Sequence, residues 1–313
     1  MVNWNANDIP SQSGKVVIVT GANSGLGYET TLALVRKNAH VIMACRNLEK
    51  GQRAVDLIEA KVPGASVELM PLDLASLASI HAFAESFIAK YDHLDQLYNN
   101  AGVMAIPRRE TADGFEMQFG TNHLGHFALT GLLLPTLLQT PHSRVITTSS
   151  GLHRTGKMDF DDLQHEKSYT RYGAYGQSKL ANILFMLELE RRLMPTAATT
   201  ISVGGHPGFS NTNLQSNSAE ASGSGIEKVM YSLGAIFAQS QAMGALPQLY
   251  AGTASDVVGG EYYGPSIMSM RGNPTLETPS DAARNEADAA RLWAISEELT
   301  GVHYRELDKE PAI

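Results

Sequence analysis

The sequence predicts an α/β fold: one domain built on a doubly wound parallel sheet with helices on both faces. Three observations support this prediction. Short apolar runs alternate with longer stretches of helical periodicity along the chain. The short runs are solidly apolar, as expected for strands that are covered on both faces. A glycine-rich turn follows the first run. Alternation at these lengths gives right-handed crossovers and therefore one layered sheet.

The expected strands are runs of valine, isoleucine and other apolar residues. In chain order they are KVVIVT (15–20), HVIMAC (40–45), SVELMPL (66–72), LDQLYN (94–99), SRVITTS (143–149) and ATTISVG (198–204), with EYYG (261–264) as a late edge candidate. Helical periodicity covers the segments between them, at 24–37, 47–61, 76–90, 112–138 and 174–194. A last helix is expected over about 280–300, beginning at a Ser280 or Asp281 cap and ending before Gly301.

The domain organisation is expected to be simple, with no internal repeat. Residues 1–313 are taken as one domain, and about 14–264 form its core. The segment SNSAEASGSG (216–225) is small and polar, which is typical of a flexible surface segment. Since an expected strand follows it, a substrate lid at about 207–250 is predicted rather than a linker. A helix and tail at about 280–313 complete the chain.

Composition excludes several classes of partner. The net charge of −8 argues against a nucleic acid, and no basic run is present. The single cysteine, Cys45, cannot form an internal disulfide, and no Cys/His cluster has the spacing of a metal site. The N-terminus lacks the features of a secretory signal. The most apolar run, FALTGLLLPTLL, is too short to span a membrane. A cytoplasmic protein without a membrane span is therefore expected.

A phosphate-binding turn is predicted directly after the first strand. The stretch TGANSGLG places Gly21, Gly25 and Gly27 between a strand and a helix. Glycines at such a turn let the backbone approach a pyrophosphate at the helix N-terminus. No Lys-Ser/Thr pair follows, which disfavours a nucleoside-triphosphate loop. A dinucleotide site is therefore expected, with the intervening residues Asn23, Ser24 and Leu26 also in contact with the ligand.

The end of the second strand indicates which dinucleotide binds. An NAD site carries an acid about twenty residues after the glycines, to accept the ribose hydroxyls. Here that place holds Arg46, whose guanidinium suits a 2′-phosphate. NADP(H) is therefore preferred over NAD(H), although a solvated arginine at a strand end is also common. Asp73 and Leu74, after the third strand, are expected near the adenine. A helix N-cap is the alternative role for Asp73.

The fourth strand ends in NNAG, residues 99–102. In sheets of this kind, ligands bind outside the carboxyl ends of the strands. Asn100, Ala101 and Gly102 are therefore expected to pack closely against the cofactor.

A phenol and an ammonium group are expected on one face of the helix at 174–194. Tyr175 and Lys179 stand four residues apart, so their side chains lie on the same side. A nearby positive charge favours the phenolate and lowers a tyrosine pKa that begins near 10. Such a tyrosine can act as an acid and base near neutral pH. A chance pair is the alternative, because a single match of this kind is weak.

Together, TGANSGLG, NNAG, TTSSG and YGQSK resemble the short-chain dehydrogenase/reductase superfamily, from about residue 14 to 264. GTNHLGHFALT and AYGQSKLANILF are similar to the retinol dehydrogenase branch, which includes the oxidoreductase part of WW-domain oxidoreductases. Two departures stand out: no N-terminal membrane anchor is visible, and the two tryptophans, Trp4 and Trp293, belong to no WW module. The resemblance implies a Rossmann-type sheet.

The resemblance also implies site residues. Tyr175 matches the family acid/base and Lys179 the residue that lowers its pKa and binds the nicotinamide ribose. Ser150, chosen over Ser149, matches the serine that holds the substrate oxygen. Asn122 matches the asparagine that kinks its helix and holds a water. HPGFSNT matches the loop over the nicotinamide, which implicates Pro207, Gly208 and Thr212.

The predicted function is an NADP(H)-dependent oxidoreductase that interconverts a lipophilic carbonyl compound and its alcohol. Met104, Tyr169, Tyr172, Phe209–Leu214, Met230 and Tyr231 are expected around the substrate, although all could equally be core residues. A scaffold that binds a dinucleotide without turnover is one alternative. A nucleotide-sugar epimerase or dehydratase is another, disfavoured by the glycine spacing. A homodimer through the helices at 112–138 and 174–194 is possible by resemblance.

Overall fold

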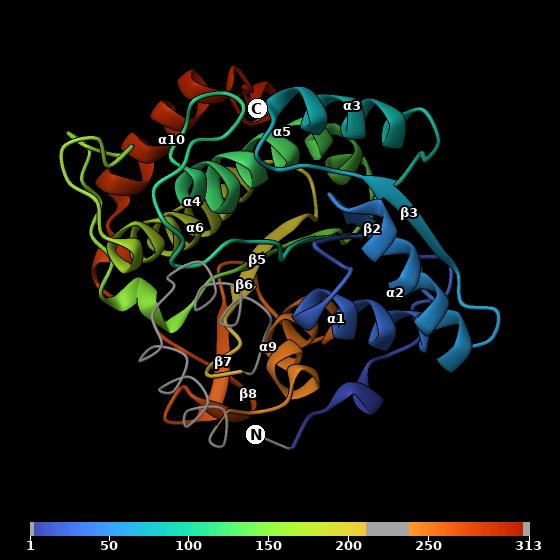
Figure 1. Ribbon diagram of the computed structural model, residues 1–313. Coiled ribbons are helices and arrows are strands. Elements are labelled where there is room, and N and C mark those ends of the chain that lie inside the picture. The colour runs from blue at the N-terminus through green and yellow to red at the C-terminus, as the bar shows by residue number, and fades with distance from the viewer. Residues whose placement is uncertain (1–2, 211–237, 309–313) are drawn as a thin grey trace.

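The fold is described here from a computed structural model, which describes residues 3–210 and 238–308. Eight strands in this part of the chain form one sheet in the order β3-β2-β1-β4-β5-β6-β7-β8, and all neighbours are parallel except β7 and β8 (Figure 1). The strands are β1 (Val16–Thr20), β2 (His40–Cys45), β3 (Val67–Pro71), β4 (Gln96–Asn99), β5 (Arg144–Thr148), β6 (Ile201–Gly205), β7 (Tyr262–Ile267) and β8 (Arg271–Leu276).

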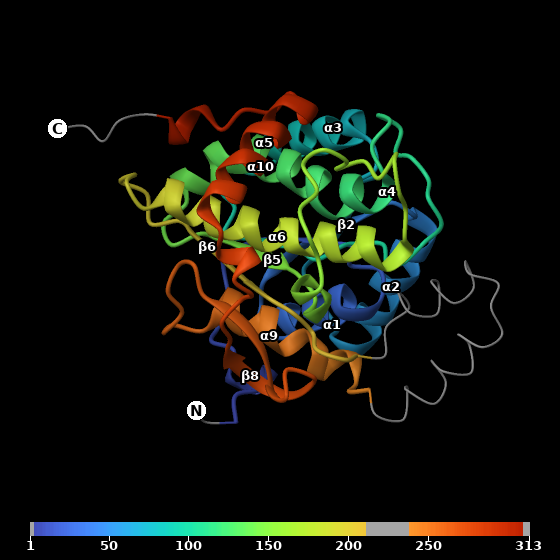
Figure 2. The ribbon, with the colours of Figure 1, turned by 90° about the vertical axis from the view of Figure 1, so that its left-hand side faces the viewer.

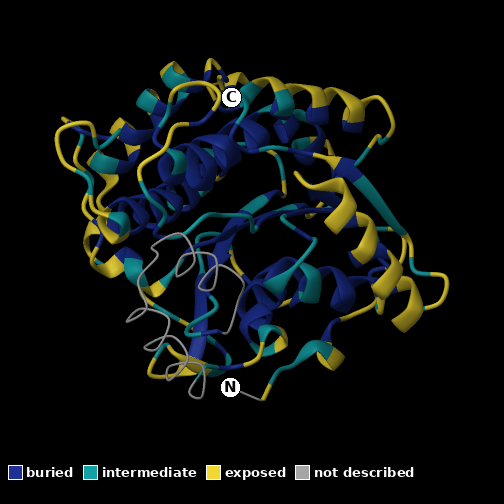
Figure 3. Cartoon of the chain, in the orientation of Figure 1, coloured by how far each residue is buried: buried dark blue, intermediate teal, exposed yellow. Residues whose placement is uncertain are grey.

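Helices cover both faces of the sheet, as predicted. On one face lie α1 (Gly25–Val35), α2 (Leu48–Lys61) and α9 (Gln241–Thr253). On the other lie α3 (Leu77–Ile88), α5 (Gly125–Gln139), α6 (Arg171–Leu193) and α10 (Glu286–Thr300), with the short α4 (Met117–Phe119) and a π-helical turn, Gly120–Leu124, before α5. Consecutive strand residues alternate between the two apolar layers, and the central strands are buried on both sides (Figure 3). The arrangement is a doubly wound, Rossmann-like α/β sheet.

Two helix starts differ from the sequence-based prediction. The helix expected from residue 112 begins at Met117, because Glu110 and Glu116 pair as an isolated bridge around a turn. The last helix begins at Glu286, where the Asn285 side chain accepts bonds from two first-turn amides. It ends as expected, before Gly301 with φ of 67°.

The strand β8 was not expected at all. Its sequence, RGNPTL, contains a proline and a glycine and shows no apolar run. It pairs only with β7, through a register shift between Pro265 and Ile267. An edge strand needs neither a continuous apolar face nor every backbone donor, so its pattern is weak.

The predicted lid, 207–250, overlaps two different parts of the chain. Residues 211–237 lie outside the described residues. Gln241–Tyr250 belong to α9, a largely buried helix that packs against α1 and the sheet. This part of the range is therefore core rather than lid.

The chain's own C-terminal segment covers the faces of α5 and α6 (Figure 2). The Tyr304 hydroxyl donates to the Phe127 carbonyl over 2.7 Å, and Trp293 stacks on Phe185 with ring centroids 5.9 Å apart. A Cβ on Gly131 would lie 2.6 Å from Val302. The faces of α5 and α6 that were expected to form a homodimer are thus partly covered by the chain's own C-terminal segment. Within the described ranges, every helix is too short or too polar to cross a bilayer.

Candidate active site

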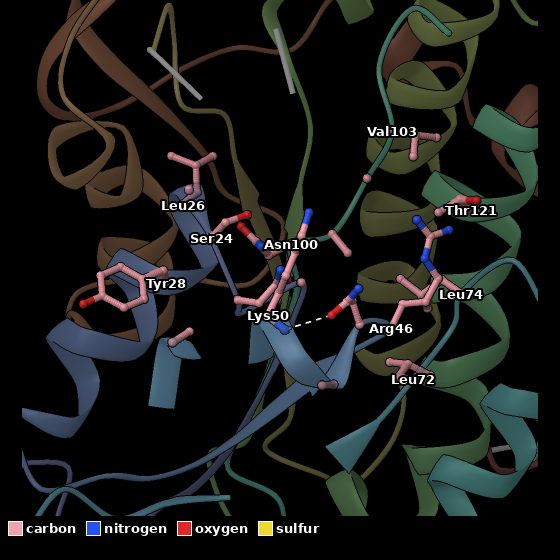
Figure 4. A pocket seen from close by; sticks show the side chains of 18 of the residues that line it. Ser24, Leu26, Tyr28, Arg46, Lys50, Leu72, Leu74, Asn100, Val103 and Thr121 are labelled. Carbon is pink, nitrogen blue, oxygen red and sulfur yellow. Dashed lines mark hydrogen bonds between the residues drawn. The ribbon is translucent and has the colours of Figure 1, made fainter. Parts of the chain in front are cut away.

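A cleft of about 740 Å³ opens at the carboxyl ends of β1 to β4 (Figure 4). Ligands of doubly wound sheets bind at this edge. The cleft is lined by most of the residues predicted to contact a cofactor: Gly21, Asn23, Ser24, Gly25, Leu26, Arg46, Asp73, Leu74, Asn100, Ala101 and Gly102. The sequence motifs that carried the prediction are therefore brought together in one place.

The turn between β1 and α1 requires its glycines. Gly21 and Gly25 have φ of +65° and +59°, which favours glycine strongly. A Cβ on Gly27 would lie 2.5 Å from the Gly21 carbonyl oxygen and 2.7 Å from Asn100 Nδ2. Ser24 stands at the N-cap of α1, but its side chain makes no capping bond. The first-turn amides of α1 therefore lack a capping side chain and point to an anion site.

Cations gather where β2 ends and α2 begins. Arg46, Lys50 and Arg53 all line the cleft and are solvent-exposed. Asn47 caps α2, accepting from the Lys50 amide over 2.8 Å (dashed in Figure 4). Arg53 is paired with Glu49 over 2.5 Å, an exposed ion pair. Arg46 was predicted from the sequence to contact a cofactor, whereas Lys50 and Arg53 were not. Their spacing on the first turns of α2 was the available signal.

Asp73 is the acid among the residues that line the cleft. Its carboxylate accepts from the Ala75 amide over 3.0 Å, which fixes the turn after β3. The N-cap of α3 is Ser76, which accepts from the Ser79 amide. The alternative in which Asp73 caps this helix is thus wrong.

The end of β4 joins the cleft to a buried polar cluster. Asn100 Nδ2 donates to the Thr20 carbonyl over 2.8 Å, which ties NNAG to the glycine turn. A Cβ on Gly102 would lie 3.0 Å from Asn122 Oδ1 and 3.5 Å from Lys179 Nζ. Gly102 therefore forms a thin wall between the cleft and this cluster.

The predicted catalytic residues lie together behind Gly102. Tyr175 and Lys179 are buried on α6, with Nζ 5.8 Å from the centre of the tyrosine ring. Lys179 Nζ also donates to the Thr148 carbonyl over 3.1 Å. Ser150 lies beside Tyr175, whose pKa it lowers, whereas the Ser149 hydroxyl donates to the Lys179 carbonyl over 2.7 Å. The two serines therefore face different groups, and Ser150 is the one next to Tyr175.

Asn122 lies in the π-helical turn before α5 and is fully buried. Its Oδ1 accepts from the Val103 amide over 2.8 Å, and its Nδ2 donates to the Val103 carbonyl and to Ser178 Oγ, each over 2.9 Å. A π-turn of this kind interrupts a helix and often marks a functional site. Asn122 therefore fixes the chain that follows NNAG.

Burial dominates the ionisation of the tyrosine and the lysine. Burial raises the pKa of Tyr175 to about 12, although its bond with Ser150 opposes the rise. Burial lowers the pKa of Lys179 to about 8. The sequence argument expected the lysine to lower the tyrosine pKa. For the chain by itself this expectation is wrong, because the free energy lost when the phenolate is desolvated exceeds the stabilisation by its neighbours.

The residues predicted around the substrate are only partly described. Pro207 and Gly208 follow β6, and Gly208 has φ of +62°. Met104 lines the cleft, and the Tyr169 hydroxyl donates to the Ile106 carbonyl over 2.7 Å. Tyr172 is 41% exposed. Thr212, Asn211–Leu214, Met230 and Tyr231 lie outside the described residues, whereas Phe209 and Ser210 belong to the loop after β6.

Known proteins resemble this chain over most of its length. The family model for short chain dehydrogenase matches residues 15–223. Retinol dehydrogenase 12 of Mus musculus is 41% identical over 293 residues, covering 93% of this chain and 88% of its own. Human retinol dehydrogenase 11 is 41% identical over 291 residues, covering 92% and 86%.

Solved structures agree with the fold. An uncharacterised protein of Mycobacterium paratuberculosis is 39% identical, with a TM-score of 0.80 over 97% of this chain and 99% of that one. A short chain dehydrogenase of Shigella flexneri in complex with NADP is 22% identical, with a TM-score of 0.61 over 80% and 96%, and supports the fold alone.

Proposed function

Because the chain belongs to the short-chain dehydrogenase family, we propose that it is an NADP(H)-dependent oxidoreductase. Its substrate is a lipophilic aldehyde or ketone, or the corresponding alcohol, and Tyr175 is the acid/base. The observation that carries this proposal is the grouping of Tyr175, Lys179, Ser150 and Asn122 directly behind Gly102, at the wall of the cleft. The cytoplasmic location expected from the sequence stays a prediction.

The cleft fits a dinucleotide on its own geometry. The uncapped first turn of α1, with its close approach of Gly27 to Gly21, would hold the pyrophosphate. Asp73 and Leu74 would lie against the adenine. A side chain at position 102 would fill the space beside Lys179, which glycine leaves open. The nicotinamide ribose would bind in this space.

The cations at the start of α2 support NADP(H) over NAD(H). Arg46 and Lys50 line the cleft with no acidic side chain paired to them among the described residues. A guanidinium presents a planar fork that suits a phosphate, and an ammonium adds a point charge. An acid that would accept ribose hydroxyls in an NAD site is replaced here by Arg46.

A bound nicotinamide supplies or accepts the hydride, and the protein handles the proton. In the reducing direction the Tyr175 hydroxyl donates its proton to the carbonyl oxygen, and in the oxidising direction the phenolate takes it back. Ser150, which lies beside Tyr175, holds the same oxygen and orients the substrate. Lys179, protonated in a dry site, attracts negative charge towards Tyr175 and so offsets part of the cost of burying a phenolate.

The substrate class is supported by apolar lining and by the names of the relatives. Val103, Met104 and Ile106 line the cleft next to Gly102. Methionine and aliphatic side chains adapt to apolar ligands of different shape. The similar proteins are called retinol dehydrogenases, which suits a lipophilic alcohol of this kind.

The test is a panel of lipophilic aldehydes, ketones and alcohols, followed by the absorbance of the reduced nicotinamide with NADPH and with NADH. The proposal expects turnover with at least one substrate and a higher kcat/KM with NADPH. Binding of NADPH without turnover of any substrate would favour the scaffold alternative.

A further inference from the structure

A second buried polar cluster lies behind the Ser150 and Pro207–Gly208 loops, outside the four residues placed in catalysis. It consists of His153, His206, Tyr262 and Glu277. The ring of Tyr262 stacks on His206 with centroids 5.6 Å apart and meets His153 edge-on at 5.8 Å. Burying a histidine or a carboxylate costs free energy unless the group is paired, so the contacts within this cluster are important for its stability.

On one side, Glu277 lies against the loop after β6. The Gly208 amide donates to His206 Nδ1 over 3.2 Å, so the proton of the neutral ring is on Nε2. That nitrogen lies 3.1 Å from Glu277 Oε2. A Cβ on Gly264 would lie 2.0 Å from Glu277 and 2.3 Å from His206, so β7 leaves room for this pair. Glu277 thus reaches the Gly208 peptide through one imidazole.

On the other side, the same segment holds the Ser150 loop. Arg154 lies 3.5 Å from Glu277 Oε2 and donates to the Thr278 carbonyl over 3.1 Å. The Ser280 amide donates to His153 Nε2 over 3.3 Å, so His153 Nδ1 carries a proton and donates to the Ser150 carbonyl over 2.7 Å. Burial alone would raise the pKa of Glu277, but its contacts with His206, Ser269 and Arg154 lower it below the ordinary value. The carboxylate is therefore charged where it meets both loops.

We propose that Glu277 is a positioning residue: the segment 277–280 joins the Ser150 loop to the Pro207–Gly208 loop and fixes their relative position. This inference rests on the function proposed above, in which both loops border the reacting groups. Catalysis is sensitive to displacements of about 1 Å, so a tie between two loops from β5 and β6 affects rate even though it touches no substrate. The strand β8, which the sequence did not predict, ends at Leu276 and so places the Glu277 carboxylate between the two loops.

The test compares Glu277→Ala and Glu277→Gln with the wild type. Glu277→Ala is expected to lower kcat about 10- to 100-fold, the scale of a small misplacement, while the NADPH dissociation constant changes less than about threefold. Glu277→Gln keeps an acceptor for His206 and is expected to lose less. Glu190→Gln is the matched control: Glu190 accepts from the Ser202 amide at the opposite end of β6. It is expected to leave kcat unchanged.

Further variants at His206 and Arg154 separate positioning from general destabilisation. Asparagine at position 206 can still accept from the amide two residues on, so His206→Asn is expected to retain most of the kcat that His206→Ala loses. Arg154→Ala combined with Glu277→Ala is expected to lose no more than Glu277→Ala alone, since both break one link. Additive losses, or a kcat for Glu277→Ala within twofold of the wild type, would overturn the inference.

Amide hydrogen exchange in the cofactor-free protein tests the inference without turnover. Glu277→Ala is expected to speed exchange of peptides covering residues 204–210 about tenfold or more, with Glu190→Gln unchanged there. If the wild type binds NADPH and reduces nothing, the proposed function fails while this measurement still decides the positioning role. Unchanged exchange in Glu277→Ala would count against it.

Discussion

Arg46, Lys50 and Arg53 stand in solvent at one end of the cleft, whereas Tyr175 and Lys179 are buried behind Gly102 at the other. We call these the arginine end and the tyrosine end. At the arginine end the exposed charges are hydrated and are screened by salt. At the tyrosine end the same kind of charge is held in a dry site, where the pKa values shift by burial. Under the proposed function, the first end selects the cofactor and the second carries out the proton transfer.

The two ends also differ in how far apart their residues lie in the sequence. The arginine end comes from one turn and the helix after it, residues 46–53. The tyrosine end draws on the π-turn, the end of β5 and α6, which are far apart in sequence. The arginine end therefore depends on local spacing, although only Arg46 was predicted there, whereas the tyrosine end depends on how the sheet brings its strands together.

The largest expected effect is at the tyrosine end. Tyr175→Phe removes the transferable proton but keeps the ring, so kcat is expected to fall by about 10³-fold or more. The NADPH dissociation constant, set mainly at the arginine end, is expected to stay within about threefold. Stopped-flow turnover and a fluorescence titration of NADPH measure the two. A Tyr175→Phe variant that retains a tenth of the activity would remove this residue from the acid/base role.

A pH-dependent stability is expected from Lys179. Burial lowers its pKa in the folded chain to about 8 from 10.5, so the folded state binds this proton less well than the unfolded state. Stability is therefore reduced while both forms are protonated, and it recovers as pH rises from about 8 to 10.5.

Lys179→Met removes this proton and keeps the chain length. Across that interval the free energy of unfolding of the wild type is expected to rise relative to Lys179→Met by a few kcal/mol, on the scale of about 1.4 kcal/mol per unit of pKa. Urea unfolding of both cofactor-free proteins over this pH range measures the difference. Parallel curves would mean that Lys179 is hydrated, and the contrast between the two ends would be lost.

At the arginine end, Arg46→Ala is expected to raise KM for NADPH about tenfold, with little change in KM for NADH, because one charge-assisted contact with a phosphate is lost. Arg46→Asp should carry the preference further towards NADH. Arg36→Ala, an exposed arginine at the end of α1 and away from the cleft, is the control. Equal changes with both cofactors would show that Arg46 does not read a 2′-phosphate.

The smallest effect is expected from salt. Exposed charges at the arginine end are screened over about 10 Å at 0.1 M ionic strength, and buried groups much less. Raising salt from low to about 0.5 M is expected to raise KM for NADPH a few-fold while kcat changes less than twofold. Steady-state kinetics at several salt concentrations measure both. A kcat that falls while KM rises would indicate that the tyrosine end is open to solvent.

Much of the fold was predictable because buried parallel strands leave a strong signal. Seven strands lie where the apolar runs placed them, and the glycine turn, Arg46 and NNAG all line one cleft. The failures have a common cause. Strand β8 is an exposed edge, α9 was assigned to a lid by the polar segment before it, and the segment 110–116 forms a turn instead of the start of a helix. At these places tertiary contacts override a weak local pattern.

The sequence by itself determined the alternation of strands and helices from β1 to β6, the phosphate turn and the spacing of Tyr175 and Lys179, because each depends on residues close together in the chain. Only the tertiary structure decided that burial raises the tyrosine pKa and that Glu277 lies close to both loops. These features arise from solvent exclusion and from contacts between distant segments, which no local pattern encodes.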